Sequence, residues 1–129
     1  MKFQPDTLDG VNVITRFDAG RLWVGSQPFT RSVLVPWTGP VQPWDPQAFE
    51  QLQAPHFERI ASFKPEVVIF GSGPRIRFAA PALMRVLIEQ RVGVETMDTA
   101  AACRTYNVLV NEGRSVLAAL LLDSTTAGG

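Results

Sequence analysis

The hydrophobic pattern over residues 66–122 alternates between short apolar runs and longer amphipathic stretches. The first run, residues 67–70, is wholly apolar and lies between Pro65 and Gly71. A short continuous run of this kind is typical of a strand that is covered on both faces, as in a parallel sheet flanked by helices. The pattern therefore predicts a buried strand at residues 67–70.

A helix is predicted to follow, beginning near Pro81 and ending at Gly93. Proline is tolerated in the first turn of a helix because its missing N–H would have no partner there. Offsets of one, three and four residues place a set of mainly apolar side chains on one helical stripe: Leu83, Met84, Leu87, Ile88 and Arg91. A second strand is predicted over residues 94–97.

A second helix is predicted to begin at Asp98 or Thr99, since either side chain can cap it by accepting backbone N–H bonds. Gly113 is predicted to end this helix, and residues 115–122 form a third buried strand. One helical face carries Ala102, Tyr106, Leu109 and Val110. The order strand, helix, strand, helix, strand predicts an α/β fold.

The early part of the chain favours antiparallel strands. Residues 11–17 and 22–24 flank a short loop that contains Gly20, which is typical of a β-hairpin. A third strand is predicted at residues 32–35. We expect these three strands to form a separate small layer or one edge of the sheet.

Residues 36–46 contain four prolines and one glycine, which predicts a stiff loop because each residue before a proline is disfavoured in the helical region. Trp37 and Trp44 lie in this loop. They could form an exposed recognition surface, but the favoured interpretation is that they hold the loop against the domain, since buried aromatic side chains fix loops at low entropic cost.

Asp45 is predicted to cap a helix that has Pro46 in its first turn. Pro55 is expected to divide the segment that follows into two helical pieces, at residues 47–53 and 56–63.

The length of 129 residues and the apolar content of 46% fit one domain at residues 11–122, between a lead-in at 1–10 and a small-residue tail at 123–129. The 12 basic residues balance the 12 acidic ones, so no overall field favours nucleic acid or an anionic membrane. Residues 1–10 contain no apolar core of signal-peptide length, and no apolar stretch of the sequence approaches the roughly 20 residues of a membrane span. We therefore expect a cytoplasmic protein without membrane insertion.

The turn Gly71-Ser72-Gly73 follows the strand at residues 67–70 directly. Ligands collect at the carboxyl ends of strands in open α/β sheets, and glycines let a backbone approach an anion closely. Arg75 or Arg77 could pair with such an anion. The amino end of the helix that begins at Asp98 would face the same crevice if the strands at residues 67–70 and 94–97 are neighbours. The sequence is neither a dinucleotide-binding fingerprint nor a Walker loop, and a tight structural turn is the alternative interpretation.

Thr99, Cys103 and Asn107 lie one turn apart on a single helical strip. A thiolate near a helix amino terminus would be nucleophilic, but no motif connects Cys103 with His56, and buried cysteine is commonly an apolar filler. One histidine, one cysteine and scattered acids match no metal-ligand spacing. The sequence thus predicts neither a metal site nor a cofactor, and the aromatic residues do not interleave with a basic stripe that would bind nucleic acid.

Residues 11–122 resemble the adipogenesis-associated Mth-like domain family, a domain of unknown function. The resemblance is densest at Gly71, Gly73, Met97, Thr99, Ala102, Cys103, Arg104, Tyr106, Asn107, Leu109, Gly113, Arg114 and Val116. It implies a three-layer α/β fold with helices on both faces of a central mixed sheet, one strand running against the others, and an additional small antiparallel β-layer formed by the early strands. What transfers as a candidate site is the turn Gly71 to Gly73 together with Thr99, Cys103, Arg104 and Asn107.

The family includes a mitochondrial assembly factor of respiratory complex I and small bacterial proteins without an assigned activity. The resemblance therefore implies a non-catalytic protein that binds a protein partner or assists assembly, and a homo-oligomer is a further prediction. The proline-rich loop and the lack of a targeting peptide depart from the family, so a mitochondrial location does not carry over. The alternative hypothesis is a small-anion-binding protein or enzyme that uses Gly71-Ser72-Gly73.

Overall fold

The computed structural model describes residues 10–18 and 20–122, and a mixed five-stranded sheet forms the middle of this part of the chain. Its strand order is β5 (Gln42–Pro43), β4 (Val33–Pro36), β8 (Val116–Leu120), β6 (Val67–Gly71) and β7 (Gly93–Met97). Strands β8, β6 and β7 are parallel, whereas β4 is antiparallel to both of its neighbours. The single reversed strand that the family resemblance implies is therefore present.

A smaller antiparallel sheet contains β1 (Ile14–Asp18), β2 (Arg21–Val24) and β3 (Gln27–Phe29). The predicted hairpin is confirmed as β1 and β2. The segment expected as a third early strand forms β4 instead and pairs with β8 in the main sheet, because all four of its residues are buried and need cover on both faces. Strand β3 was not predicted; it contains Pro28, which an edge strand tolerates.

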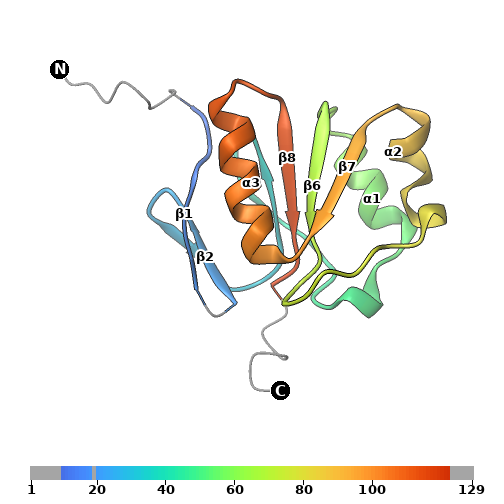
Figure 1. Cartoon of the computed structure of the whole chain (residues 1–129), viewed down its shortest axis with the longest axis horizontal. Coiled ribbons are helices and arrows are strands. Elements are labelled where there is room, and N and C mark those ends of the chain that lie inside the picture. Colours follow the sequence, from blue (N-terminus) through green and yellow to red (C-terminus); the bar gives the residue numbers. More distant parts are fainter. Residues whose placement is uncertain (1–9, 19, 123–129) are drawn as a thin grey trace.

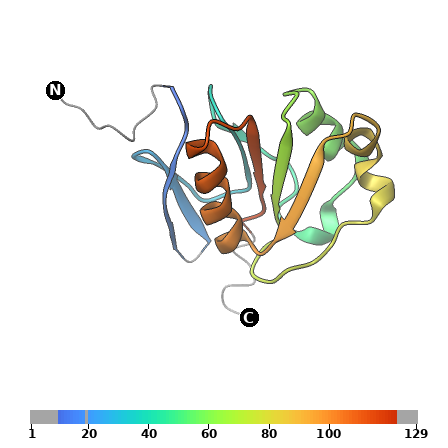
Figure 2. The same ribbon diagram turned by 45° about the horizontal axis from the view of Figure 1, so that its top comes forward.

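Helices cover both faces of the main sheet. Helix α3 (Thr99–Asn111) packs on β6 and β8 from one side, and the β1–β2 hairpin lies beside it in both views (Figures 1 and 2). On the other side lie α1 (Ala54–Ala61) and α2 (Arg85–Glu89), with the 3-10 turns η1 (Phe49–Gln51) and η2 (Pro81–Met84). The predicted three-layer α/β class is confirmed.

The apolar residues of β6 alternate between two hydrophobic clusters, one on each side of the sheet. Val67 and Ile69 pack with the α3 side, whereas Val68 and Phe70 pack with the α1 side. This alternation explains why an uninterrupted apolar run forms a strand here, since successive side chains point to opposite faces and both faces are covered.

The predicted cap of α3 is confirmed, because the Asp98 carboxylate accepts a hydrogen bond of 2.8 Å from the Ala101 amide. The predicted end of the preceding helix is wrong. Helix α2 ends at Glu89, and Arg91 takes the left-handed conformation with φ of 60° while the Val92 amide bonds to the Leu87 carbonyl. Gly93 is thereby released to begin β7.

Asp45 caps no helix, contrary to the prediction. The Gln47 side chain accepts from the Ser32 amide and donates to the carbonyls of Trp44 and Asp45, which holds this segment as a loop against the start of β4. The two helical pieces expected within residues 47–63 are present as the shorter η1 and as α1. Pro55 lies in the first turn of α1 instead of between the two pieces.

Trp44 holds the proline-rich loop against the domain, as the favoured interpretation predicts. Its side chain is buried, its indole N–H donates to the His56 carbonyl at 3.3 Å, and its ring meets Phe57 and Phe70 edge to face. Trp37 is half-buried against the α3-side cluster.

The predicted tail at residues 123–129 and residues 1–9 of the predicted lead-in lie outside the described residues. The division of the chain into lead-in, single domain and tail stays a prediction. Among the helices of residues 10–18 and 20–122, none combines the length and the apolar character that crossing a bilayer requires.

Candidate functional site

The glycine turn lies where the carboxyl ends of the parallel strands meet. Gly71 ends β6, and Thr99 begins α3 directly after the neighbouring strand β7, at the lower edge of the sheet in Figure 1. The Thr99 amide donates to the Gly73 carbonyl at 2.8 Å, and the Gly73 amide donates to the Thr99 hydroxyl at 2.9 Å. The turn and the helix start are therefore in direct contact, as the sequence predicts.

Thr99 joins three segments of the chain. Its buried hydroxyl accepts from the Gly73 amide and donates to the Leu121 carbonyl at 2.9 Å. Gly71 permits this close approach, because a Cβ at that position would lie 3.0 Å from both the Cα and the hydroxyl of Thr99. Glycine is thus required here for packing between strand and helix.

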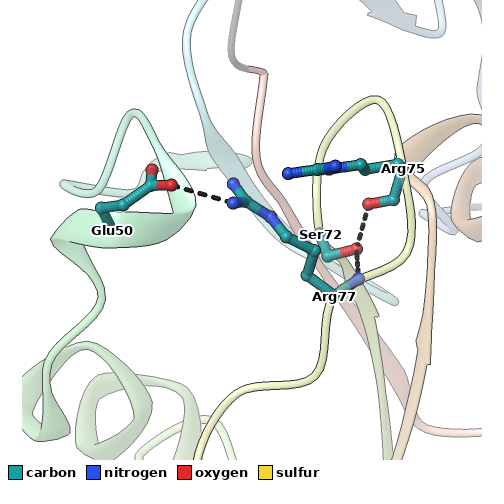
Figure 3. A network of polar contacts seen from close by, with 4 residues as sticks. All are labelled: Glu50, Ser72, Arg75 and Arg77. Carbon is teal, nitrogen blue, oxygen red and sulfur yellow. Dashed lines mark hydrogen bonds and ion pairs between the residues drawn. The ribbon is translucent and has the colours of Figure 1, made fainter.

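Ser72 organises the loop that follows. Its amide donates to the Met97 carbonyl at 2.9 Å, and its buried hydroxyl accepts from the Arg77 amide at 2.9 Å. The same hydroxyl lies 2.8 Å from the Arg75 carbonyl oxygen, to which it can donate (Figure 3). The backbone amides of Ser72 and Gly73 are both bonded within the fold, which is how a structural turn behaves.

Two arginines extend from this loop toward η1. Arg77 donates to the Glu50 carboxylate at 2.8 Å, and its guanidinium lies 4.4 Å from the centre of the Phe49 ring. In Figure 3 the side chains of Arg75 and Arg77 both extend toward the side on which Glu50 lies. The hydrogen bond from Arg77 lowers the pKa of Glu50, and the charge of Arg75 lowers it further. An acidic and two basic groups therefore lie together at this edge.

The rest of the predicted strip faces β1. Cys103, Arg104 and Asn107 line an open groove of about 430 Å³ between α3 and β1. Cys103 is 4% exposed, and burial raises the pKa of its thiol to about 12. Asn107 is bonded to the backbone of β1. At neutral pH this thiol is protonated and is not a nucleophile.

The predicted site residues thus form two groups. Those at the glycine turn are Gly71, Ser72, Gly73, Arg75 and Thr99, and those at the groove beside β1 are Cys103, Arg104 and Asn107. His56 lies on α1, on the opposite side of the main sheet from Cys103, where its ring nitrogen accepts from the Gln53 amide. No Cys–His pair is formed.

Sequence reasoning missed the partners of Arg77. Glu50 and Phe49 lie 27 and 28 positions before it, in a segment that showed no chemical motif. The alternation of arginine with large apolar residues at 75–78 was the available signal. Within the described residues, no three His, Cys, Asp or Glu side chains gather as metal ligands.

A family model for proteins of unknown function, DUF498/DUF598, matches residues 14–121. Among curated proteins, the bovine NADH dehydrogenase (ubiquinone) 1 alpha subcomplex assembly factor 3 is 30% identical over 99 residues, which is 75% of this chain and 53% of the relative. The chain therefore spans about half the length of the assembly factors that it matches.

Solved structures agree with this match. A crystal structure of a Bordetella parapertussis protein has a TM-score of 0.83 at 36% identity, covering 89% of this chain and 98% of its own. An NMR structure from Bordetella pertussis, described as a Mth938-like domain, has a TM-score of 0.82 at 31% identity, covering 95% and 93%. The chain therefore belongs to the DUF498/DUF598 family, the Mth-like domain family that its sequence resembles.

Proposed function

We propose that this protein binds a protein partner and assists the assembly of a multi-subunit complex, without catalysing a reaction. The observation that carries the proposal is the 30% identity with the bovine assembly factor over 75% of this chain. By its name, that relative assists the assembly of NADH dehydrogenase. Since the matched part is about half of the relative, both the role and the partner in this protein are proposals.

The geometry of the candidate site supports a structural use of its polar residues. Ser72, Thr99 and Asn107 each bind backbone groups of another segment. Burial keeps the Cys103 thiol protonated at neutral pH. Side chains that are hydrogen-bonded to other segments keep the surface in one conformation. A surface with one conformation is suited to binding a partner.

The small-anion alternative stays a prediction that the geometry disfavours. The amides of Ser72 and Gly73 would have to exchange the Met97 carbonyl and the Thr99 hydroxyl for a ligand. A ligand present at 100 times its dissociation constant should stabilise the protein by about 2.7 kcal/mol. A thermal-shift screen with phosphates, nucleotides and carboxylates tests this, and a melting temperature that none of them changes contradicts the alternative.

The assembly role is tested by deleting the gene in its source cell and separating membrane complexes on a native gel. We expect a decrease in fully assembled NADH dehydrogenase and an accumulation of subcomplexes, both restored by the wild-type gene. Normal amounts of the assembled enzyme in the deletion strain would contradict the role in NADH dehydrogenase assembly.

Location and oligomeric state are separate predictions. Cell fractionation tests whether the protein is cytoplasmic, and light scattering of the purified chain tests whether it forms a homo-oligomer. Neither result depends on the identity of the partner.

A further inference from the structure

The loop between β6 and η2 exposes large apolar side chains next to arginines. Phe78 is 71% exposed and Ile76 is 49% exposed, and they alternate with Arg75 and Arg77. We propose that the surface formed by Phe49, Glu50, Arg75, Arg77 and Phe78, called here the Arg77 surface, binds a partner-protein segment that carries a carboxylate beside an apolar side chain. This inference rests on the proposed partner-binding function.

The apolar half of the Arg77 surface is a shallow groove. It has a volume of about 550 Å³, and its large apolar lining residues are Phe49, Leu52, Phe78 and Leu83. An isolated exposed apolar residue is common in folded proteins, but here exposed Phe78 lies with half-buried Phe49 and Leu83 around a hollow, as at a recognition site. The groove is large enough to take one or two apolar side chains of an extended or helical segment.

The charged half favours an acidic partner. Two arginines face one carboxylate, and within the described residues Arg75 makes no ion pair. Arg77 contacts Glu50 through one terminal nitrogen, and its buried Nε has no hydrogen-bond partner among the described residues. The local charge is therefore one unit positive, and a second carboxylate would balance it with charge-assisted hydrogen bonds.

The surface is held in place before any partner arrives. The Ser72 hydroxyl fixes the backbone at both Arg75 and Arg77 (Figure 3). The Phe49 ring supports the Arg77 guanidinium. Since the loop backbone and the Arg77 side chain are already held in place, binding loses less conformational entropy than it would at a mobile loop. Arginine beside an aromatic side chain is also a combination that contributes strongly at protein interfaces.

Peptide selection tests the proposal directly. A displayed library of random peptides about twelve residues long is selected on the wild-type protein, and enriched peptides are measured by fluorescence anisotropy. We expect Asp or Glu next to Leu, Ile or Phe, with affinity that falls as salt rises. Phe78→Asp and Arg75→Glu should each weaken binding at least about tenfold, a free-energy difference of about 1.4 kcal/mol.

Matched variants on α3 and β2 supply the controls. Val108 is 56% exposed, so Val108→Asp places the same charge on a comparable apolar position on the other side of the sheet. Arg21→Glu, on β2, reverses the charge of another exposed arginine. Both controls should bind the peptides as the wild type does. The surface assignment is wrong if no peptide is enriched, if the enriched peptides lack acidic residues, or if the controls weaken binding as much as Phe78→Asp does.

A membrane surface or a second copy of this chain could occupy the Arg77 surface instead, and each would give a different experimental result that overturns the assignment. Binding to vesicles of phosphatidylglycerol that Phe78→Asp abolishes would indicate a membrane surface instead. A dimer in light scattering that Phe78→Asp converts to a monomer would indicate a second copy of this chain.

Capture experiments separate failure of this inference from failure of the proposed function. If wild-type protein captures NADH dehydrogenase subunits and Phe78→Asp captures them equally well, the function stands and the Arg77 surface is wrong. If the wild type captures none while the selected acidic peptides still bind, the surface stands and the assembly role is wrong.

Discussion

The side chain of Asn107 pairs with the backbone of Ile14 through two hydrogen bonds. Its carbonyl oxygen accepts from the Ile14 amide at 2.9 Å, and its amide nitrogen donates to the Ile14 carbonyl at 2.7 Å. The two residues are 93 positions apart. The Asn107 side chain thus bonds to the backbone of β1 as a neighbouring strand would. This pairing fixes the small sheet to α3.

Replacing Asn107 by alanine should destabilise the protein by about 2 kcal/mol, because it leaves both polar groups of Ile14 without their partner. Urea denaturation measures the change. Val108→Ala, at the neighbouring exposed position, is the control and should change stability by less than about 0.5 kcal/mol. Equal stabilities for Asn107→Ala and wild type would mean that water replaces the amide at no cost.

Removing the Thr99 hydroxyl should cost about 2 kcal/mol or more, because Thr99→Val leaves the Gly73 amide and the Leu121 carbonyl unpaired in a buried place. Thr105→Val, a half-buried position on the same helix, should have little effect. Thermal unfolding gives the melting temperatures of Thr99→Val and Thr105→Val. Similar melting temperatures for the two variants would contradict the role given to Thr99.

Gly71→Ala should destabilise the protein by about 1 to 3 kcal/mol, because its methyl group would meet Thr99 and Leu120 at 3.0 Å in a packed region. Gly93→Ala is the matched control in β7, where the nearest atom outside the neighbouring residues, on Val67, lies 4.0 Å away. Denaturant midpoints compare the stabilities of the two variants. A Gly71→Ala variant as stable as Gly93→Ala would show that strand and helix can separate freely.

Alkaline pH should destabilise the protein partly through Cys103. Burial raises the pKa of its thiol from 9.0 to about 12, so the folded state favours the protonated form. The stabilisation is complete below pH 9 and is lost as pH rises from 9 toward 12, by about 1 kcal/mol per pH unit. Urea midpoints from pH 8 to 10.5 should fall more steeply for the wild type than for Cys103→Ala. Parallel slopes would contradict this contribution.

Local signals predicted much of the secondary structure. The apolar run of β6, the carboxylate of Asp98 and the hairpin loop at Gly20 each act within a few residues, and each element formed where it was expected. Apart from the end of α2, which the conformation of Arg91 sets locally, the errors arose where one segment depends on another. Gln47 binds Ser32 and prevents the helix expected at Asp45, and β4 pairs with β8 instead of the adjacent hairpin.

The candidate site shows the same division. The turn at Gly71 and the helix start at Thr99 were expected together, because parallel strands place their carboxyl ends at one edge. The contact of Arg77 with Glu50 could not be predicted, since it joins a loop to a 3-10 turn that no pattern relates.

The sequence by itself determined the α/β class and the order of strands and helices over residues 66–122, because periodicity, caps and turns are properties of neighbouring residues. The family followed from the resemblance of the sequence. Only the tertiary structure decided which strands share a sheet, which backbone Asn107 binds and which side chains surround Arg77. These relationships join residues that are far apart in the chain, and they depend on how whole elements pack to bury their apolar faces.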